Sequence, residues 1–250
     1  MYKIDKFYRF ARIFVLLKFY SMDSILSWDY AAMVFLNLGK YHNGGLDFFM
    51  WMNSQILIWL PVILMFIYVL VKNKKRDALA IIGMTIFVFL LCDQISSSIL
   101  KPLIARSRPS RDPLVMNLLQ YVNDYRGGLF GFPSSHAANS FGFAVFSALI
   151  FRYKPYSVVV MLWAALCAYT RLYLGVHFPT DIICGTILGV CVGFFCYWIY
   201  SKFLLRPTGY YVKSSDKTTS SGFLYSDVLW LIWTLVVIEF ILVFAGFNFW

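Results

Sequence analysis

Charged residues are scarce in this chain of 250 residues: Asp, Glu, Lys and Arg make up 14%, whereas 60% of the residues are hydrophobic. That balance excludes an ordinary soluble domain. Several apolar stretches approach the roughly 20 residues that an α-helix needs to cross a bilayer, so the composition predicts an integral membrane protein. The sequence also lacks a cleavable signal with a small-residue cleavage site, and we expect the whole chain to belong to the mature protein.

Paired cysteines with metal-ligand spacing are missing too. The five cysteines stand singly inside apolar runs, which indicates small core residues, and we expect neither a metal nor another cofactor. Acidic residues are few, 12 against 22 Lys and Arg, which gives a formal net charge of +10. Because the basic residues fall in short loops between apolar stretches, they favour a membrane surface as partner rather than nucleic acid.

The apolar stretches that are present predict an all-α bundle of six transmembrane helices. They are residues 54–71, 78–99, 134–151, 157–174, 181–204 and 227–246. Basic residues concentrate in the connections after the first, third and fifth stretches. The positive-inside rule therefore assigns those connections to the cytoplasm, and the opposite helix ends to the periplasm or an equivalent compartment.

The first 53 residues do not fit this pattern. Residues 7–20 and 24–38 are apolar but short, and basic residues interrupt the first of them. We expect residues 1–53 to form an amphipathic, interfacial segment ahead of a transmembrane domain at 54–250. The side of the membrane that the amino terminus occupies is left open.

Small residues recur at every fourth position of the fifth stretch. Gly185, Gly189 and Gly193 form a GxxxGxxxG ridge, a pattern that lets two helix backbones approach closely. We favour packing within one chain over a dimer interface, because such ridges are common in membrane helices. The oligomeric state is left open.

Polar residues gather in three clusters, and each cluster lies at the outward end of a predicted helix. The first follows the second stretch, another opens the third stretch, and the last joins the fourth stretch to the fifth. Their members are Lys101 and Arg108; Ser134, Ser135 and His136; and Arg171, His177 and Asp181. Because all three fall on the same side of the membrane, we expect them to meet at one mouth of the bundle.

The cations of these clusters suit a phosphate. The planar guanidinium groups of Arg108 and Arg171 match phosphate oxygens in pairs, and Lys101 adds a compact point charge. Ser134 opens a helix, whose unpaired amides and positive dipole end also favour an anion. The clusters therefore predict an anion site at a membrane surface.

Two of the chain's three histidines add chemistry to this site. His177 and Asp181 share one face if the helix begins by Phe178, so the carboxylate can hold one ring nitrogen and leave the other as a nucleophile. His136 comes from another loop and can serve as a general acid. Taken singly, each residue has a structural alternative such as a helix cap or an interfacial cation, but their common sidedness favours catalysis.

With these residues the sequence resembles the type-2 phosphatidic acid phosphatase superfamily, which shares its site with vanadium-dependent haloperoxidases. The family signature K-x6-R-P, P-S-G-H and S-R-x5-H-x3-D matches residues 101–109, 133–136 and 170–181. The resemblance extends over roughly residues 50–205 in the arrangement of the apolar stretches. Ser135 replaces the family's Gly and Thr170 its Ser, and Ser135 adds a side chain where Gly lets the backbone approach the phosphate.

The resemblance implies a role for each matched residue. His177 attacks phosphorus to give a phosphohistidine, Asp181 orients it, and His136 protonates the leaving group and then activates water. The residues that hold the phosphoryl oxygens are Lys101, Arg108, Arg171, Ser134 and Ser135. No metal is implied. Three further arginines could contact a second phosphate, although solvated loop cations are favoured; they are Arg106, Arg111 and Arg126.

The resemblance also implies a function: a membrane-embedded lipid phosphatase in the bacterial inner membrane, with its site facing the periplasm. Undecaprenyl diphosphate and phosphorylated lipid A are the favoured substrates, ahead of phosphatidic acid and phosphatidylglycerol phosphate. A phosphotransferase that delivers the phosphoryl group to another lipid stays open. A non-enzymatic lipid-binding or transport protein is disfavoured, because it has no use for the His177 and Asp181 pair.

Overall fold

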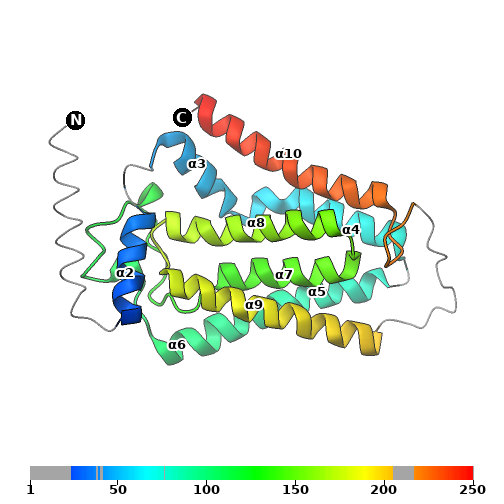
Figure 1. Ribbon diagram of the computed structural model, residues 1–250, viewed down its shortest axis with the longest axis horizontal. Coiled ribbons are helices and arrows are strands. Elements are labelled where there is room, and N and C mark those ends of the chain that lie inside the picture. The colour runs from blue at the N-terminus through cyan, green and yellow to red at the C-terminus, as the bar shows by residue number, and fades with distance from the viewer. Residues whose placement is uncertain (1–23, 38, 40–41, 76, 205–216, 250) are drawn as a thin grey trace.

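The computed structural model describes residues 24–37, 39, 42–75, 77–204 and 217–249. Within these ranges the chain is an all-helical bundle, whose long helices lie side by side in Figure 1. The α-helices are α2 (Ser24–Leu36), α3 (Gly44–Asn53), α4 (Leu60–Asn73), α5 (Ala78–Asp93), α6 (Lys101–Ile104), α7 (Ser135–Phe151), α8 (Lys154–Tyr173), α9 (Pro179–Ile199) and α10 (Tyr225–Phe249). The chain is therefore an integral membrane helical bundle, as its composition predicts.

Five helical segments are long and apolar enough to cross a membrane. They are Ile56–Lys74, Ala78–Ile104, Lys154–Tyr173, Pro179–Leu204 and Tyr225–Asn248. Each corresponds to one of the predicted stretches, with boundaries that differ by a few residues. The third predicted stretch forms α7, which is apolar but has only 17 residues and rises about 25 Å along its axis.

Helix α7 is short because it is the core of the bundle rather than part of its lipid-facing wall. It packs against α5, α8 and α9, and the side chains that it buries are mostly small. The glycine ridge of α9 lies directly against it: a Cβ atom at Gly189 would come within 2.3 Å of the Ala138 carbonyl oxygen. Gly185 and Gly193 meet Ser134 and Gly142 in the same way. This confirms the predicted packing within one chain.

The second membrane helix runs further than predicted. A π-helical turn at Gln94–Leu100 joins α5 to α6, and the amide of Lys101 donates to the carbonyl of Ser96, five residues back. This wide turn lets the helix continue to Ile104 although Pro102 has no amide hydrogen to donate. Lys101 therefore lies on the helix, whereas the sequence assigned it to the following loop.

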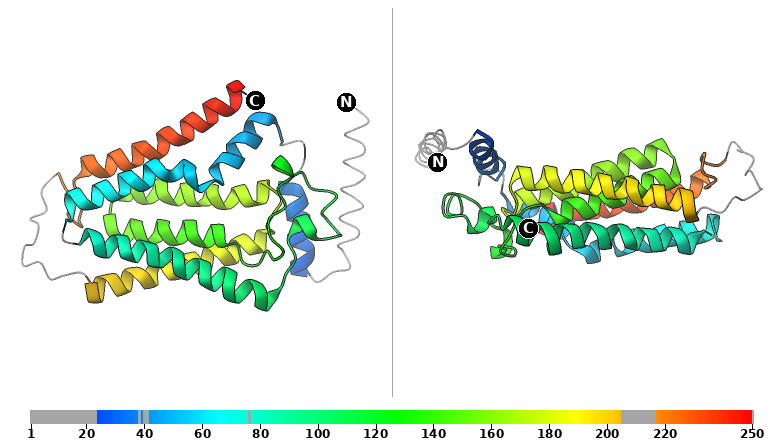
Figure 2. Two further views of the ribbon diagram at one scale, coloured as in Figure 1. Left: turned by 180° about the vertical axis from the view of Figure 1, so that it is seen from behind. Right: turned by 90° about the horizontal axis from the view of Figure 1, so that it is seen from below.

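The amino-terminal helices pack closely on the bundle. Figures 1 and 2 show α2 lying across the ends of the membrane helices, where Met33 is fully buried with Val115 and Leu172 in one apolar cluster. Helix α3 crosses α10, and a Cβ atom at Gly45 would come within 2.7 Å of the Gly246 carbonyl oxygen. The amphipathic stretch predicted at residues 7–20 lies outside the described residues.

The two ends of the bundle differ in what they carry. The connections after α4, α7 and α9 lie at the end far from α2 (Figure 1). The long connection from α6 to α7, and the turn from α8 to α9, lie at the end beside α2. These two connections hold most of the predicted site residues, so the predicted separation of basic loops from the phosphate site is visible in the fold.

Candidate active site

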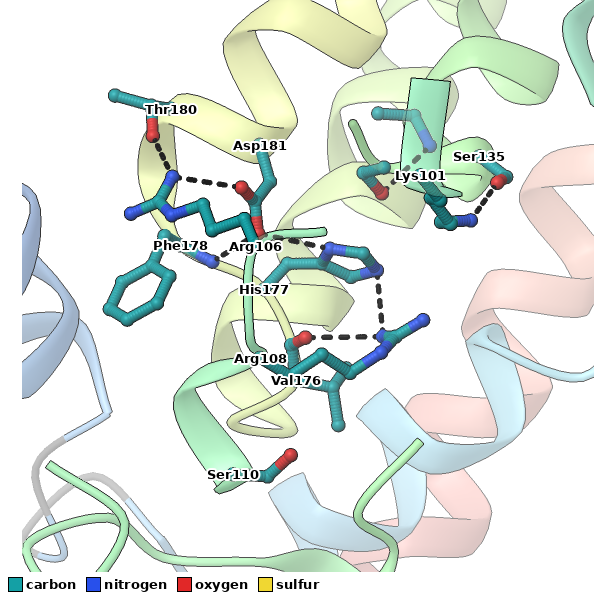
Figure 3. A network of polar contacts seen from close by, with 12 residues as sticks. Lys101, Arg106, Arg108, Ser110, Ser135, Val176, His177, Phe178, Thr180 and Asp181 are labelled. Atoms are coloured by element: carbon teal, nitrogen blue, oxygen red, sulfur yellow. Dashed lines mark hydrogen bonds and ion pairs between the residues drawn. The ribbon is translucent and has the colours of Figure 1, made fainter. Parts of the chain in front are cut away.

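The three polar clusters meet at the end of the bundle beside α2, as Figure 3 shows for the residues that it labels. Lys101 comes from α6, Arg108 from the loop that follows, Ser135 from the first turn of α7, and His177 and Asp181 from the start of α9. His136 interacts electrostatically with His177, Arg108, Arg171 and Lys101, which assigns it to the same group. Residues that are far apart in the sequence thus form a single site.

His177 is held at both ring nitrogens and is only 1% exposed. Its Nδ1 lies 3.3 Å from Oδ2 of Asp181, and its Nε2 lies 2.9 Å from Nη1 of Arg108. An arginine can only donate, so Nε2 must accept, and in the neutral ring Nδ1 then carries the hydrogen and donates to Asp181. This tautomer leaves the nucleophilic lone pair on Nε2, the atom that Arg108 covers.

The pKa of His177 is lowered well below its ordinary value. Burial of the ring is the main cause, and the positive charges of Arg108, Arg171 and Lys101 add to it. Each disfavours the imidazolium, so the ring is neutral at neutral pH. A neutral imidazole with a free lone pair is the form that a histidine nucleophile requires.

The pairing of His177 with Asp181 comes from a helix start rather than from a helix face. Helix α9 begins at Pro179, and Asp181 Oδ2 accepts from the amide of Phe178 at 3.0 Å in a capping box. His177 precedes the helix, in the turn after α8. Gly175 makes that turn with a φ of +73°, a conformation that glycine adopts without strain.

Two buried arginines hold donors that are unused among the described residues. Arg108 donates to the Val176 carbonyl at 3.1 Å and to His177, and Arg171 donates to the Tyr125 hydroxyl at 3.3 Å. The Nε atoms of both arginines are buried without a hydrogen-bond partner in that part of the chain. Buried donors are normally paired, so two unpaired ones beside His177 fit an anion that would complete them.

Ser135, the residue that departs from the family pattern, binds Lys101. Its hydroxyl accepts from the Lys101 ammonium group and lies 2.9 Å from the hydroxyls of both Ser96 and Ser97. Ser97 also accepts from Lys101 at 3.2 Å. The π-helical turn brings Ser96, Ser97 and Lys101 to one side of the helix, so the added side chain anchors the lysine there.

The other two predicted residues of the α7 cluster differ in accessibility. Ser134 is fully buried and caps α7, because its Oγ accepts from the Ala137 amide at 3.4 Å. Its amide donates to the Asp181 carbonyl at 2.9 Å, which ties the starts of α7 and α9 together. His136, in contrast, is exposed. An exposed His136 beside a buried His177 fits a proton donor at the mouth of the site.

The three additional arginines serve the loop itself. Arg106 is bound by carboxylates, Arg111 donates to the carbonyls of Gly127 and Gly128, and Arg126 stacks over the Tyr121 ring at 3.7 Å. Arg111 and Arg126 are exposed, which fits the favoured assignment as loop cations, whereas Arg106 is partly buried. Within the described ranges, no three His, Cys, Asp or Glu side chains gather as a metal site would need.

Two residues close to the site were missed in the sequence. Tyr125 lies in the long loop and contacts Arg171, and nothing in its sequence neighbourhood points to that role. Asp29 lies on α2, is only 1% exposed, and binds Arg106 and Thr180. A lone carboxylate in an apolar helix was a signal that could have marked it.

The comparisons with known proteins agree with this geometry. Residues 78–205 match the model of the PAP2 superfamily. A lipid A 4'-phosphatase of Bacteroides thetaiotaomicron is 38% identical over 71% of this chain and 80% of its own length. The lipid A 4'-phosphatase of Porphyromonas gingivalis is 37% identical over 83% of this chain and 86% of its own length.

Two solved structures share the fold. One is the transmembrane PAP2-type phosphatidylglycerolphosphate phosphatase of Bacillus subtilis, with a TM-score of 0.57 and 22% identity over 81% of this chain and 98% of its own. The other is LpxE of Aquifex aeolicus, with a TM-score of 0.51 and 24% identity over 66% of this chain and 92% of its own. At such low identity they support the helical architecture alone.

Proposed function

We propose, because this chain belongs to the PAP2 superfamily and is a membrane lipid phosphatase, that it removes the 4'-phosphate of lipid A. The two lipid A 4'-phosphatases, at 37% and 38% identity over most of their length, support this substrate. The other substrates considered from the sequence, undecaprenyl diphosphate among them, have less support: the undecaprenyl-diphosphatase of Bacillus subtilis is 22% identical over 67% of this chain.

The observation that carries the mechanism is the environment of His177 Nε2. Its lone pair faces a guanidinium group, and the Nε atoms of Arg108 and Arg171 are buried without partners in the described part of the chain. A phosphoryl group placed there would accept from both arginines. Arg108 would then release Nε2, which becomes free to attack the phosphorus that replaced it.

The reaction has two steps. In the first, Nε2 of His177 forms a bond to phosphorus while the bond from phosphorus to the sugar oxygen breaks, and His136 gives its proton to that oxygen. In the second, His136 takes a proton from water, the water oxygen bonds to phosphorus, and the bond to Nε2 breaks to release phosphate. Asp181 accepts from Nδ1 throughout and stabilises the positive charge that the ring acquires.

The cations and hydroxyls around His177 stabilise the phosphoryl oxygens as charge redistributes. Arg108 and Arg171 act directly, and Lys101 adds charge from the position that Ser135 fixes. Ser134 already accepts from the Ala137 amide, so its hydroxyl hydrogen is what it can offer to a phosphoryl oxygen. No step of this mechanism requires a metal.

In the membrane, we propose that α7 is a sixth span, enclosed by the five longer ones. The basic connections at one end of the bundle then face the cytoplasm, and the site at the other end faces the periplasm across a bacterial inner membrane. A lipid whose phosphorylated headgroup lies at this surface can present its phosphate to His177 while its acyl chains stay in the bilayer.

The test is phosphate release by the purified protein from lipid A, undecaprenyl diphosphate and phosphatidic acid in detergent, with a chelator present. We expect release from lipid A to be fastest, with loss of the 4'-phosphate visible by mass spectrometry. The His177→Ala variant should stay folded and lose at least about 10⁴-fold in kcat. Undiminished turnover by this variant, or a clear preference for another lipid, would overturn the corresponding part of the proposal.

A further inference from the structure

We propose that α2 belongs to the catalytic centre, because Asp29 holds Arg106 and Arg106 in turn fixes the carboxylate of Asp181. Both are positioning residues, since neither contacts His177 in the structure. The inference rests on the proposed roles of His177 and Asp181, and it assigns a function in turnover to a helix outside residues 78–205 of the family match.

Arg106 joins two carboxylates through separate nitrogen atoms. Its Nη1 donates to Oδ1 of Asp181 at 3.0 Å, and its Nη2 donates to Oδ2 of Asp29. Nη1 also lies 2.6 Å from the Thr180 hydroxyl, and the guanidinium lies 4.2 Å from the centre of the Phe178 ring. This planar fork fixes both the distance and the direction between the two acids, which a point charge could not do.

Asp181 divides its oxygen atoms between two tasks. Oδ2 accepts from the Phe178 amide and lies beside Nδ1 of His177, whereas Oδ1 is bound by Arg106 (Figure 3). Without Arg106, Oδ1 would be a buried acceptor that competes for the same donors by rotation of the carboxylate. Arg106 therefore keeps Oδ2 directed at His177.

The backbone around Asp181 leaves this carboxylate little room. A Cβ atom at Gly131 would stand 2.8 Å from Oδ2, and the Gly131 amide donates to the Arg106 carbonyl at 2.9 Å. The loop that carries Arg106 thus also forms the wall beside Oδ2. A displacement of Arg106 moves both features, so its effect on His177 should exceed that of a distant salt bridge.

Asp29 is placed for this task rather than for solubility. It is almost fully buried, and its oxygens accept from the Thr180 amide at 2.9 Å and from the Thr180 hydroxyl at 2.5 Å. Those contacts bind α2 to the first turn of α9, one residue before Asp181. A buried carboxylate on an apolar helix is costly unless it is paired, and its partner here is Arg106.

Helix α2 has other anchors that keep it in place when Asp29 is changed. The Asn37 side chain donates to the Tyr173 carbonyl at 2.6 Å and accepts from the Gln120 amide at 2.7 Å. Tyr30 donates to the Asp112 carboxylate. Since these contacts do not involve Asp181, Tyr30→Phe is a matched control: it weakens the neighbouring anchor of α2 and leaves the link to Asp181 intact.

The experiment compares Asp29→Asn, Arg106→Gln, the double variant and Tyr30→Phe by lipid phosphate release, vanadate inhibition and thermal unfolding. We expect kcat to fall about tenfold for Asp29→Asn and about 100-fold for Arg106→Gln, as for residues that orient a catalytic group from behind. KM and the vanadate inhibition constant should stay within about twofold, because neither residue contacts the phosphoryl group. Tyr30→Phe should keep the wild-type kcat.

The double variant decides whether Asp29 acts through Arg106. If it does, Asp29→Asn has no further effect once Arg106 is gone, so the double variant matches Arg106→Gln. Arg106→Lys should resemble Arg106→Gln, because an ammonium group cannot span both carboxylates. Multiplicative losses in the double variant, or losses confined to thermal stability with kcat unchanged, would overturn the inference.

The His177→Ala variant separates this inference from the proposed function. If His177→Ala is inactive while Arg106→Gln turns over normally, only the role of the Asp29 and Arg106 pair is wrong. If His177→Ala remains active, the proposed nucleophile fails and the inference fails with it.

Discussion

Two arginines separated by one residue, Arg106 and Arg108, approach His177 from opposite sides and differ in how fully they are paired. Arg106 binds two carboxylates and a threonine hydroxyl. Arg108 reaches only a carbonyl and the His177 ring, and its Nε is buried without a partner in the described chain. A buried cation with every donor used is part of the scaffold, whereas one with donors to spare waits for an anion. Charge and position in the sequence do not separate the two; the count of partners does.

The same distinction separates the two ends of the His177 ring. At Nδ1 the network is complete and runs back through Asp181 and Arg106 to α2. At Nε2 it is incomplete and made of cations, as a phosphate site should be before the phosphate enters. Changes on the Nε2 side should therefore act on both substrate binding and turnover, and changes on the Nδ1 side on turnover alone.

The largest expected effect comes from removing a cation with spare donors. Arg171→Ala should lower kcat/KM about 10³-fold and weaken vanadate inhibition by a similar factor, because Arg171 would stabilise both the bound phosphoryl group and the transition state. Measured KM, kcat and vanadate inhibition test this directly. Arg126→Ala is the matched control: this exposed arginine stacks on Tyr121, and its loss should change kcat/KM less than about threefold. Unaltered vanadate inhibition in Arg171→Ala would contradict the distinction drawn here.

An intermediate effect is expected in the pH profile. Because burial and nearby cations lower the pKa of His177, the nucleophile stays neutral as the pH falls through about 6.5, the ordinary histidine value. The acid limb of kcat/KM should accordingly lie below that value in the wild type. Arg108→Gln removes one of the charges that disfavour the imidazolium, so it should raise the pKa of His177 and move the acid limb to higher pH. Measurement of kcat/KM between about pH 4.5 and pH 8 decides this; a shift in the opposite direction would count against His177 as the group that titrates.

The smallest expected effect concerns Ser135. Ser135→Ala removes the hydroxyl that accepts from Lys101, so the ammonium group should be less well placed and KM should rise about threefold with kcat nearly unchanged. Ser98→Ala serves as the control, because the exposed Ser98 on the same helix segment donates to Gln94 and takes no part in this contact. Equal kinetics for the two variants would show that Ser135 does not position Lys101.

Much of the architecture was predictable because a bilayer imposes its own length and composition on a helix. Five apolar stretches became helices long enough to span, and the glycine ridge on α9 packs within the chain as expected. The sequence could not show that α7 is enclosed by its neighbours, since its apolar composition is the same whether it faces lipid or protein. Nor could it show that a π-helical turn carries Lys101 on the helix, because that turn exists to carry the chain past Pro102.

The sequence by itself determined the residue types and the side of the membrane on which they gather: two histidines, an aspartate and three cations at the outward ends of apolar helices. That much follows from local spacing and charge, which are properties of a linear chain. Only the tertiary structure decided which of those cations keep donors to spare, which tautomer His177 adopts, and that Asp29 reaches Asp181 through Arg106. Such assignments depend on hydrogen bonds between residues up to 152 positions apart, from Asp29 to Asp181, and those form only when the helices have packed.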